Sequence, residues 1–355
     1  MILLLSFDVR RQGGIERLSL QVQSSLERRG EQVVLLCPQR LGAGPLGRLL
    51  GRLGFLICLG WWLPQAQHIL CMHALLLKPV LWLQPLRPQT QQLFCWLHGI
   101  EVWGAALQPV AGALRRCGGL VASSSFTRDQ LVAGSDSWPP IQVVHPMADL
   151  IDACEAADPL PEGLRLLTVA RMDAGERYKG HRLILQSLRQ LKESHALPET
   201  LQWRVVGQGN DRQALEQQCE DWGLTPWVRF LGGISDGALK QELRSCSLLL
   251  MPSAFAIEAD GRSCGEGFGI VYLEAAQAGR ASIACTLGGQ CDLIVHGSTG
   301  WLIEPDPNEL AELLLQLAED PQALVTAGEK AQKRAMTRFS QASFDQALAA
   351  ALQTC

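Results

Sequence analysis

Two glutamates eight positions apart carry the chemistry that this sequence suggests first. Glu266 lies between Gly265 and Gly267, and Glu274 follows within an apolar segment that ends at Gly279. The glycines predict a tight loop whose backbone N–H groups approach a ligand closely, and the residues after them predict a buried helix. The two carboxylates are then roughly 10–12 Å apart at 1.5 Å per residue. That separation suits a long ligand with hydroxyls at both ends and anionic charge between them, such as a nucleotide-sugar.

The alternative for this stretch is an ordinary loop and helix with two solvated glutamates, since charged side chains are usually exposed. A carboxylate inside an otherwise apolar helix, directly after a loop with glycine at every second position, favours the ligand site instead. Phe268 and Gly269 complete the loop on the helix side.

Two cations in a second segment would complement such an anion. Arg171 ends a predicted strand at residues 164–170, and Lys179 precedes a predicted helix at residues 181–191. Both side chains therefore project from one strand-to-helix loop. A guanidinium and an ammonium at that place would neutralise a diphosphate, most strongly as charge develops on a leaving group. The alternative is a solvated basic loop.

Three residues of the first half fall where a doubly wound sheet binds its ligands, at the carboxyl ends of the strands. Gly13 and Gly14 follow a predicted strand at residues 2–7, and His98 ends another at residues 93–98. A lone Gly-Gly also fits a plain turn, and a lone histidine is more often structural than catalytic. The position at a strand end favours a functional role for His98.

These segments resemble the retaining GT-B glycosyltransferases, and in particular family four, the glycosyl transferases group 1. Glu266 and Glu274 match the E-x7-E signature, and residues 171–180 match the R-x-D-x-x-E-R-Y-K-G form of the diphosphate-binding segment. Residues 13–17 resemble the G-G-x-E-R turn, and residues 98–101 resemble the H-G-x-E segment. The resemblance covers most of the chain, is specific for residues 164–302 and is weaker across residues 1–150.

The resemblance implies a role for each matching residue. Arg171 and Lys179 would stabilise the leaving diphosphate, helped by backbone N–H groups from Gly267 to Gly269. Glu266 would orient the donor sugar, and Glu274 would hold the ribose. His98 would approach the sugar from the other domain, and Gly13 and Gly14 would lie near the donor phosphates. Asp292 stands where the family usually has Glu, and Ala281 where it usually has Pro, which puts local donor contacts in doubt.

Composition describes a globular protein with a large core, because 47% of the 355 residues are hydrophobic and 19% are charged. The net charge of −4 is divided unevenly: residues 1–150 have 13 Lys and Arg against 8 Asp and Glu, while residues 151–355 have 18 against 27. A basic first half suits an anionic membrane surface or acceptor. Nucleic acid is not expected, since no basic run has interleaved aromatics.

Twelve scattered cysteines without a C-x-x-C predict reduced thiols in a cytosolic protein, with neither a zinc site nor a disulfide framework. The apolar start of the chain lacks a basic region and a cleavage site, and we interpret it as a buried strand instead of a signal peptide. No apolar run reaches transmembrane length.

Residues 46–63 are the most unusual part of the first half. Arg48 and Arg52 precede a nearly uncharged stretch that contains Trp61 and Trp62 and ends before Pro64. Such a helix could lie flat on a membrane interface. A helix that is apolar all round is also typical of a protein core, and we favour burial.

Alternating strands and helices predict an α/β protein of the GT-B class, with two Rossmann-like, doubly wound domains facing a cleft. Residues 1–150 would form an acceptor-side domain and residues 164–335 a domain that binds the nucleotide-sugar donor, joined by a linker at residues 149–163. One long helix is expected at residues 321–352, and residues 336–355 would cross back to the first domain. Residues 252–264 are expected to form a polar loop that delivers Glu266.

The leading hypothesis is a retaining hexosyltransferase that moves a hexose from a UDP- or GDP-sugar to a glycan or lipid-linked acceptor, in cell-surface polysaccharide or glycolipid synthesis. It would need no metal or other cofactor and would work in the cytoplasm or at the inner face of the membrane. A nucleotide-sugar epimerase of the same fold is an alternative, although Glu266 and His98 alone are a poor acid–base set. A non-catalytic glycan-binding relative is another, although Arg171, Lys179 and Glu266 are all present.

Overall fold

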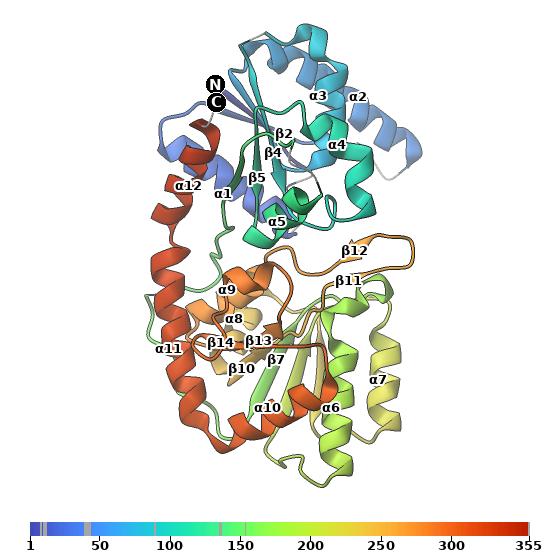
Figure 1. Cartoon of the computed structure of the whole chain (residues 1–355), viewed down its shortest axis with the longest axis vertical. Helices are drawn as coiled ribbons and strands as arrows, with labels where there is room; N and C mark the ends of the chain where they lie inside the picture. Colours follow the sequence, from blue (N-terminus) through green and yellow to red (C-terminus); the bar gives the residue numbers. More distant parts are fainter. Residues whose placement is uncertain are drawn as a thin grey trace. The chain divides into compact units, whose positions relative to one another are not determined.

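The computed structural model describes residues 1–7, 9, 13–38, 44–88, 90–134, 137–152 and 154–353. The chain forms two compact units, each built on its own six-stranded sheet (Figure 1). Unit 1 consists of Met1–Met147, Ala259–Ser263 and Gln341–Cys355, and unit 2 of Ala148–Glu258 and Cys264–Ser340. All neighbouring strands in both six-stranded sheets are parallel.

Unit 1 has the strand order β2-β1-β3-β4-β5-β6, in which the chain winds outward in both directions from β1. The strands read as continuous apolar runs because helices cover both faces of a parallel sheet; all four residues of β1 are buried. The strands are β1 (Ile2–Leu5), β2 (Val33–Leu36), β3 (His68–Cys71), β4 (Gln92–Leu97), β5 (Gly119–Ala122) and β6 (Ile141–Val143). The longer helices are α1 (Gly14–Arg28), α2 (Pro45–Trp62), α3 (Leu77–Trp82), α4 (Gln108–Leu114), α5 (Ser125–Ala133) and α12 (Gln341–Gln353).

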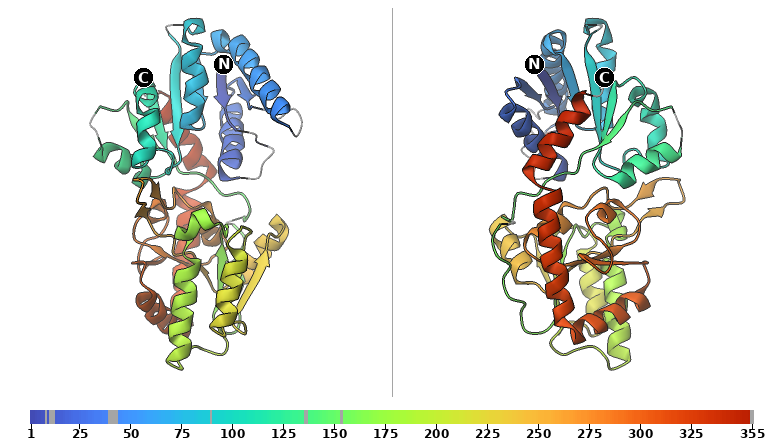
Figure 2. Two further views of the ribbon diagram at one scale, coloured as in Figure 1. Left: turned by 90° about the vertical axis from the view of Figure 1, so that its right-hand side faces the viewer. Right: turned by 60° about the vertical axis from the view of Figure 1, so that its left-hand side comes forward.

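The last helix, α12, completes the core of unit 1. It packs on α1, β5 and β6 and is the short red helix that ends the chain in Figure 2. Phe344 of this helix stacks on Trp96, with the ring centroids 6.4 Å apart. The buried indole Nε1 of Trp96 donates a hydrogen bond of 2.8 Å to the Ser123 hydroxyl. Without α12 the apolar face around Trp96 would be open to water, so the C-terminal segment is part of this unit.

Unit 2 has the strand order β14-β13-β10-β7-β8-β9. Its strands are β7 (Arg165–Val169), β8 (Gln202–Val206), β9 (Val228–Gly232), β10 (Leu248–Leu250), β13 (Ser282–Cys285) and β14 (Gly300–Ile303). Its helices are α6 (His181–Glu193), α7 (Arg212–Asp221), α8 (Asp236–Ser245), α9 (Ile270–Gln277), α10 (Pro307–Glu319) and α11 (Pro321–Arg338), with the 3-10 turns η5 (Ala174–Lys179) and η6 (Gly289–Asp292). These helices pack on the sheet through an apolar face. In α6, for example, Ile184, Leu188 and Leu191 recur at helical spacing and are buried.

The structure corrects two predicted elements near the C-terminus. The helix expected at residues 321–352 is two helices, α11 and α12, separated at Phe339, whose φ of −118° is not helical. The segment at residues 252–264 is not a plain loop, since β11 (Ala256–Ile257) and β12 (Ser263–Cys264) pair within it. The tip of this hairpin belongs to unit 1, where Ala105 N–H donates to the Gly261 carbonyl at 3.0 Å.

The prediction that residues 46–63 are buried all round is wrong. Helix α2 buries one face through Phe55 and Leu59, and Leu63 directly after it is also buried, but large apolar side chains on the opposite face are exposed. The side chain of Arg48 lies outside the described part of the chain, whereas Arg52 is described and exposed. Within the described ranges, no helix combines the length and the apolar character needed to cross a bilayer.

All eleven cysteines in the described part of the chain are free thiols. Burial raises the pKa of Cys117 to about 12 and that of Cys95 well above the ordinary value. Thiols of this kind are poor nucleophiles, because the thiolate is the reactive form.

Candidate active site

The glycine-spaced loop before α9 is held in place by close backbone approaches. Gly269 is the N-cap of the helix with a φ of +87°, and a Cβ there would lie 2.4 Å from Cδ2 of Tyr272. Gly289 N–H donates a 2.7 Å hydrogen bond to the Glu266 carbonyl. A Cβ on Gly289 would lie 2.1 Å from the Gly267 carbonyl oxygen. Glycine is therefore needed at both positions, and the backbone around Glu266 has little freedom.

Glu274 lies within α9, as the sequence predicts, and the residue as a whole is only 5% exposed. The helix continues to Gln277, and Gly279 follows with a φ of +70°, the left-handed residue that commonly ends a helix. Carboxylates are rarely buried to this degree in an apolar helix unless they have polar partners. The side chain of Phe268 is also buried, so this residue can offer a ligand only its backbone.

Lys179 and Glu266 form the central contact of this region. The ammonium Nζ donates to Glu266 Oε2 at 2.7 Å, and each side chain is 14% exposed. Lys179 is the last residue of η5, and Gly180 follows with a φ of +86° as the N-cap of α6. Residues 87 positions apart in the sequence are thus joined at the loop that precedes α9.

The surroundings keep Lys179 positively charged. Burial by itself lowers the pKa of this amine, but the Glu266 carboxylate and neighbouring Tyr178 outweigh burial, so the net shift is upward. Burial also raises the pKa of Tyr178 to about 12. The pKa of His181 falls to about 4, first because of burial and then because of the positive charges of Lys179 and Arg182. The site therefore presents a fixed cation beside a neutral imidazole and a neutral phenol near pH 7.

Arg171 is not part of this buried cluster. It follows β7, as predicted, but its side chain is 75% exposed and its guanidinium donates to the carboxylate of Glu176 within η5. Of the two predicted cations, the structure joins only Lys179 to Glu266. To contact a ligand at Glu266, the Arg171 guanidinium would have to leave the Glu176 carboxylate.

His98, Gly13 and Gly14 belong to unit 1. His98 follows β4, and its Nε2 lies 2.6 Å from the Met72 carbonyl oxygen. Because a carbonyl oxygen only accepts, Nε2 is the donor in this contact. Gly13 is the N-cap of α1 and Gly14 its first residue; a Cβ on Gly13 would lie 2.2 Å from Oε2 of Glu16. Gln12, directly before this pair, lies outside the described residues.

Sequence reasoning missed His73, which follows β3 at the same edge of the unit 1 sheet as His98. The two imidazole rings are stacked with centroids 6.2 Å apart, and Phe7, after β1, lies 4.9 Å from His73. Nδ1 of His73 accepts the Leu75 N–H at 3.1 Å. Burial lowers the pKa of His73, with a smaller opposing effect of Glu101. Its position two residues after a buried strand is the one signal that could have identified it.

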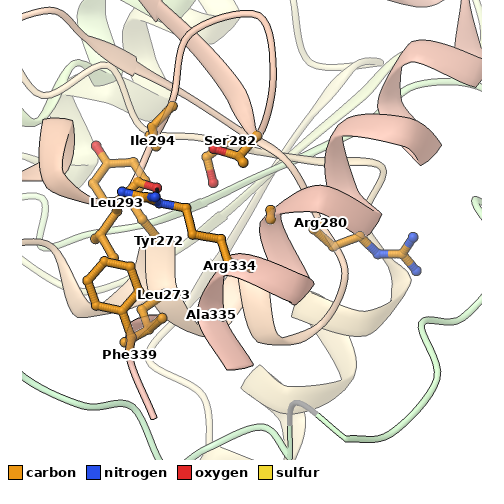
Figure 3. A pocket seen from close by; sticks show the side chains of 12 residues that line it. Tyr272, Leu273, Arg280, Ser282, Leu293, Ile294, Arg334, Ala335 and Phe339 are labelled. Atoms are coloured by element: carbon orange, nitrogen blue, oxygen red, sulfur yellow. Dashed lines mark hydrogen bonds between the residues drawn. The ribbon is translucent and has the colours of Figure 1, made fainter. Parts of the chain in front are cut away.

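A small pocket of about 10 Å³ lies beside α9 in unit 2 (Figure 3). Tyr272, Arg334 and Phe339 lie together at its wall, whereas the guanidinium of Arg280 points away from the group. A space of that size holds at most about one water molecule, so it is not a substrate site. Tyr272 also donates its hydroxyl to the Met251 carbonyl, which ties α9 to the end of β10. The described side chains include no group of three or more His, Cys, Asp or Glu arranged to hold a metal ion.

Residues 161–334 match the family model described as glycosyl transferases group 1. The amylovoran biosynthesis glycosyltransferase AmsK of Erwinia amylovora is 28% identical over 52% of this chain and 43% of its own length. The phosphatidyl-myo-inositol mannosyltransferase of Mycobacterium leprae is 27% identical over 94% of this chain and 91% of its own length. The chain spans half or less of the length of the first curated relatives that it matches.

Solved structures match over the whole chain. Anabaena Alr3699/HepE, solved in complex with UDP and glucose, superposes with a TM-score of 0.75 at 20% identity and covers 100% of this chain and 99% of that one. Sucrose-phosphate synthase from Thermosynechococcus elongatus superposes with a TM-score of 0.80 at 19% identity, over 98% of this chain and 97% of that one. With its two parallel α/β units, the fold is GT-B, as the sequence predicts.

Proposed function

Residues 161–334 match the glycosyl transferases group 1, and from this premise we propose that the whole chain is a retaining hexosyltransferase. It would transfer a hexose from a UDP- or GDP-sugar to a glycan or lipid-linked acceptor, in the synthesis of a cell-surface polysaccharide or glycolipid. The matched residues lie almost entirely in unit 2, which we assign as the donor-binding unit, with unit 1 providing the acceptor side.

The observation that carries this proposal is the Lys179–Glu266 contact of 2.7 Å at the start of the segment that leads into α9. A buried ion pair is costly to maintain, and charged groups whose pKa values are shifted by burial and a specific partner cluster at functional sites. The loop after Glu266 also presents backbone N–H groups at a helix N-terminus, which favours anions. A ligand with a diphosphate next to sugar hydroxyls would use the ammonium, the N–H groups and the carboxylate at once.

In the proposed reaction, the bond between the anomeric carbon and the diphosphate oxygen breaks as the acceptor oxygen forms a bond to the same face of that carbon. Negative charge grows on the departing nucleoside diphosphate, where Lys179 and the loop N–H groups stabilise it. Glu266 accepts hydrogen bonds from the donor sugar, and Glu274 from the ribose. The acceptor proton passes to the leaving phosphate oxygen, so the reaction needs no separate general base.

Two relatives support a choice of donors to test first. HepE is solved in complex with UDP-glucose, and ALG2 of Homo sapiens is named an alpha-1,3/1,6-mannosyltransferase. UDP-glucose and GDP-mannose are therefore the first candidates for this chain, with ADP-glucose as a further member of the panel.

A thermal-shift panel of these nucleotide-sugars tests the proposal. We expect one of them to stabilise the wild type, by about 2.7 kcal/mol at a concentration 100 times its Kd. Glu274→Gln should remain folded and lose that stabilisation. The matched control is Glu312→Gln, which changes an exposed carboxylate on α10 of the same unit and should respond like the wild type.

Failure of every donor to stabilise the protein, or an unchanged response in Glu274→Gln, would count against the assignment. Once the stabilising donor is known, mass spectrometry of the products distinguishes the transferase from the alternative, a nucleotide-sugar epimerase. A transferase consumes donor only with acceptor present and releases the nucleoside diphosphate, whereas an epimerase changes the free nucleotide-sugar without releasing it.

A further inference from the structure

Helix α2 is apolar on two opposite faces, and only one of them is covered by unit 1. Phe55 and Leu59, four residues apart, face inward and are at most 8% exposed. On the other side, large apolar side chains recur every three or four residues and are 46–73% exposed: Leu46, Leu49, Leu50, Leu53, Ile57 and Trp61. At 100° per residue these six lie within about one third of the helix circumference, opposite the buried side chains. We call these six residues the outer face of α2.

The outer face continues onto the turn η3 (Gln84–Leu86). Leu86 is 47% exposed, and its Cδ1 lies 4.0 Å from where a Cβ on Gly60 of α2 would be. Trp82, at the end of α3, is 75% exposed. Figure 1 shows α2 at the margin of unit 1. Contiguous apolar surface of this kind marks an interaction site, whereas single exposed apolar residues need no explanation.

The Lys, Arg, Asp and Glu residues of the segment that contains this face have one sign of charge. No aspartate or glutamate occurs at the 69 positions from residue 32 to residue 100, where about seven would be expected from 35 in 355. The same stretch has five basic residues, of which Arg52 and Lys78 are described and exposed. Beside η3, Arg87 and Arg116 line an open groove together with Gln84 and Gln91. An apolar strip is thus combined with basic residues in a segment of the sequence that contains no acid.

We propose that the outer face of α2 docks on the surface of an anionic phospholipid bilayer, with the helix lying in the plane of the interface. Apolar side chains would enter the boundary between headgroups and acyl chains, and the basic residues would contact lipid phosphates. Trp61, at the end of the helix, suits this position because tryptophan favours membrane–water interfaces. A second copy of the chain is a poorer occupant, since a symmetric contact would bring the basic residues of this segment in the two copies together.

Vesicle flotation with the full chain tests the proposal. The wild type should float with vesicles of phosphatidylcholine and phosphatidylglycerol, and much less with phosphatidylcholine alone. Ile57→Ser/Trp61→Ser should lower the bound fraction at least tenfold on the anionic vesicles. The control Val132→Ser/Met336→Ser changes two exposed apolar residues outside α2 and should bind like the wild type. Arg52→Glu/Lys78→Glu should weaken binding to anionic vesicles only.

Circular dichroism should show that all variants are folded, since every substituted side chain is exposed. Wild-type protein that does not float with anionic vesicles would overturn the proposal, as would an Ile57→Ser/Trp61→Ser variant that floats equally well. A wild-type dimer in analytical ultracentrifugation that this variant converts to a monomer, without vesicle binding by either, would assign the face to self-association instead. Vesicle binding does not depend on the donor, so its failure is distinguishable from failure of the proposed transferase activity.

Discussion

The Lys179–Glu266 contact allows a test that separates structural from functional roles of one ion pair. The perturbations are Lys179→Met, Glu266→Gln and the double variant. At 2.7 Å and an effective dielectric constant of about 20, the Coulomb attraction between the two charges is about 6 kcal/mol. Desolvation offsets much of this, because each side chain is only 14% exposed.

We therefore expect each single variant to lower the free energy of unfolding by about 3 kcal/mol, the lower end for breaking a buried pair. The double variant leaves no uncompensated charge, so its loss should be smaller than the sum of the single losses. The expected coupling energy is about 2 kcal/mol, typical of a charged hydrogen bond. Urea unfolding followed by tryptophan fluorescence measures these values.

Donor binding should respond differently from stability in the same variants. The double variant should lose about 4 kcal/mol, clearly less than the sum of the two single losses, yet calorimetry should detect no binding of the donor identified in the thermal-shift panel. Coupling below about 0.5 kcal/mol would show that the two side chains act independently in solution. A double variant that binds donor as tightly as the wild type would refute the assigned role of the pair.

Two further predictions concern the same unit. The pKa of His181 is lowered to about 4, so as the pH falls the unfolded chain takes up a proton before the folded chain does. The free energy of unfolding should therefore decline by about 3 kcal/mol between pH 6.5 and pH 4. His181→Gln should remove this part of the pH dependence, as measured by urea unfolding at several pH values. An unchanged slope would contradict this. Gly269→Ala should lower the free energy of unfolding by at least about 2 kcal/mol, because a left-handed backbone and a 2.4 Å approach to Tyr272 both oppose a Cβ. The control Gly237→Ala, in α8 with open space around it, should be neutral or stabilising, and equal effects of the two changes would refute the reasoning.

The sequence predicted the local structure around Glu266 and Glu274 better than the side-chain contacts there. The glycine loop and the helix with Glu274 follow from residue types alone, since glycine spacing and an apolar run have direct conformational meaning. That Lys179, not Arg171, joins Glu266 could not be predicted, because both cations lie on one loop. The conformation of η5, with Glu176 close enough to hold Arg171, decides between them.

Two features of the fold, the exposed face of α2 and the break between α11 and α12, depend on tertiary packing and could not be predicted from the spacing of apolar residues. Helix α2 is apolar on both faces, so its pattern could not tell which face the rest of unit 1 covers. The break between α11 and α12 occurs at Phe339, and the sequence has no Gly or Pro close to this position that would predict a helix end. Phe339 packs with Phe268 in unit 2, whereas Phe344 packs with Trp96 in unit 1, so the helix ends where the chain passes between cores.

The most direct test of the proposed function is a crystal structure of the chain with the stabilising nucleotide-sugar bound. We predict that Lys179 Nζ lies within hydrogen-bond distance of a diphosphate oxygen and that the Glu274 carboxylate accepts from the ribose hydroxyls. A nucleotide-sugar bound away from the loop at residues 265–269, with Lys179 still paired only to Glu266, would contradict the account.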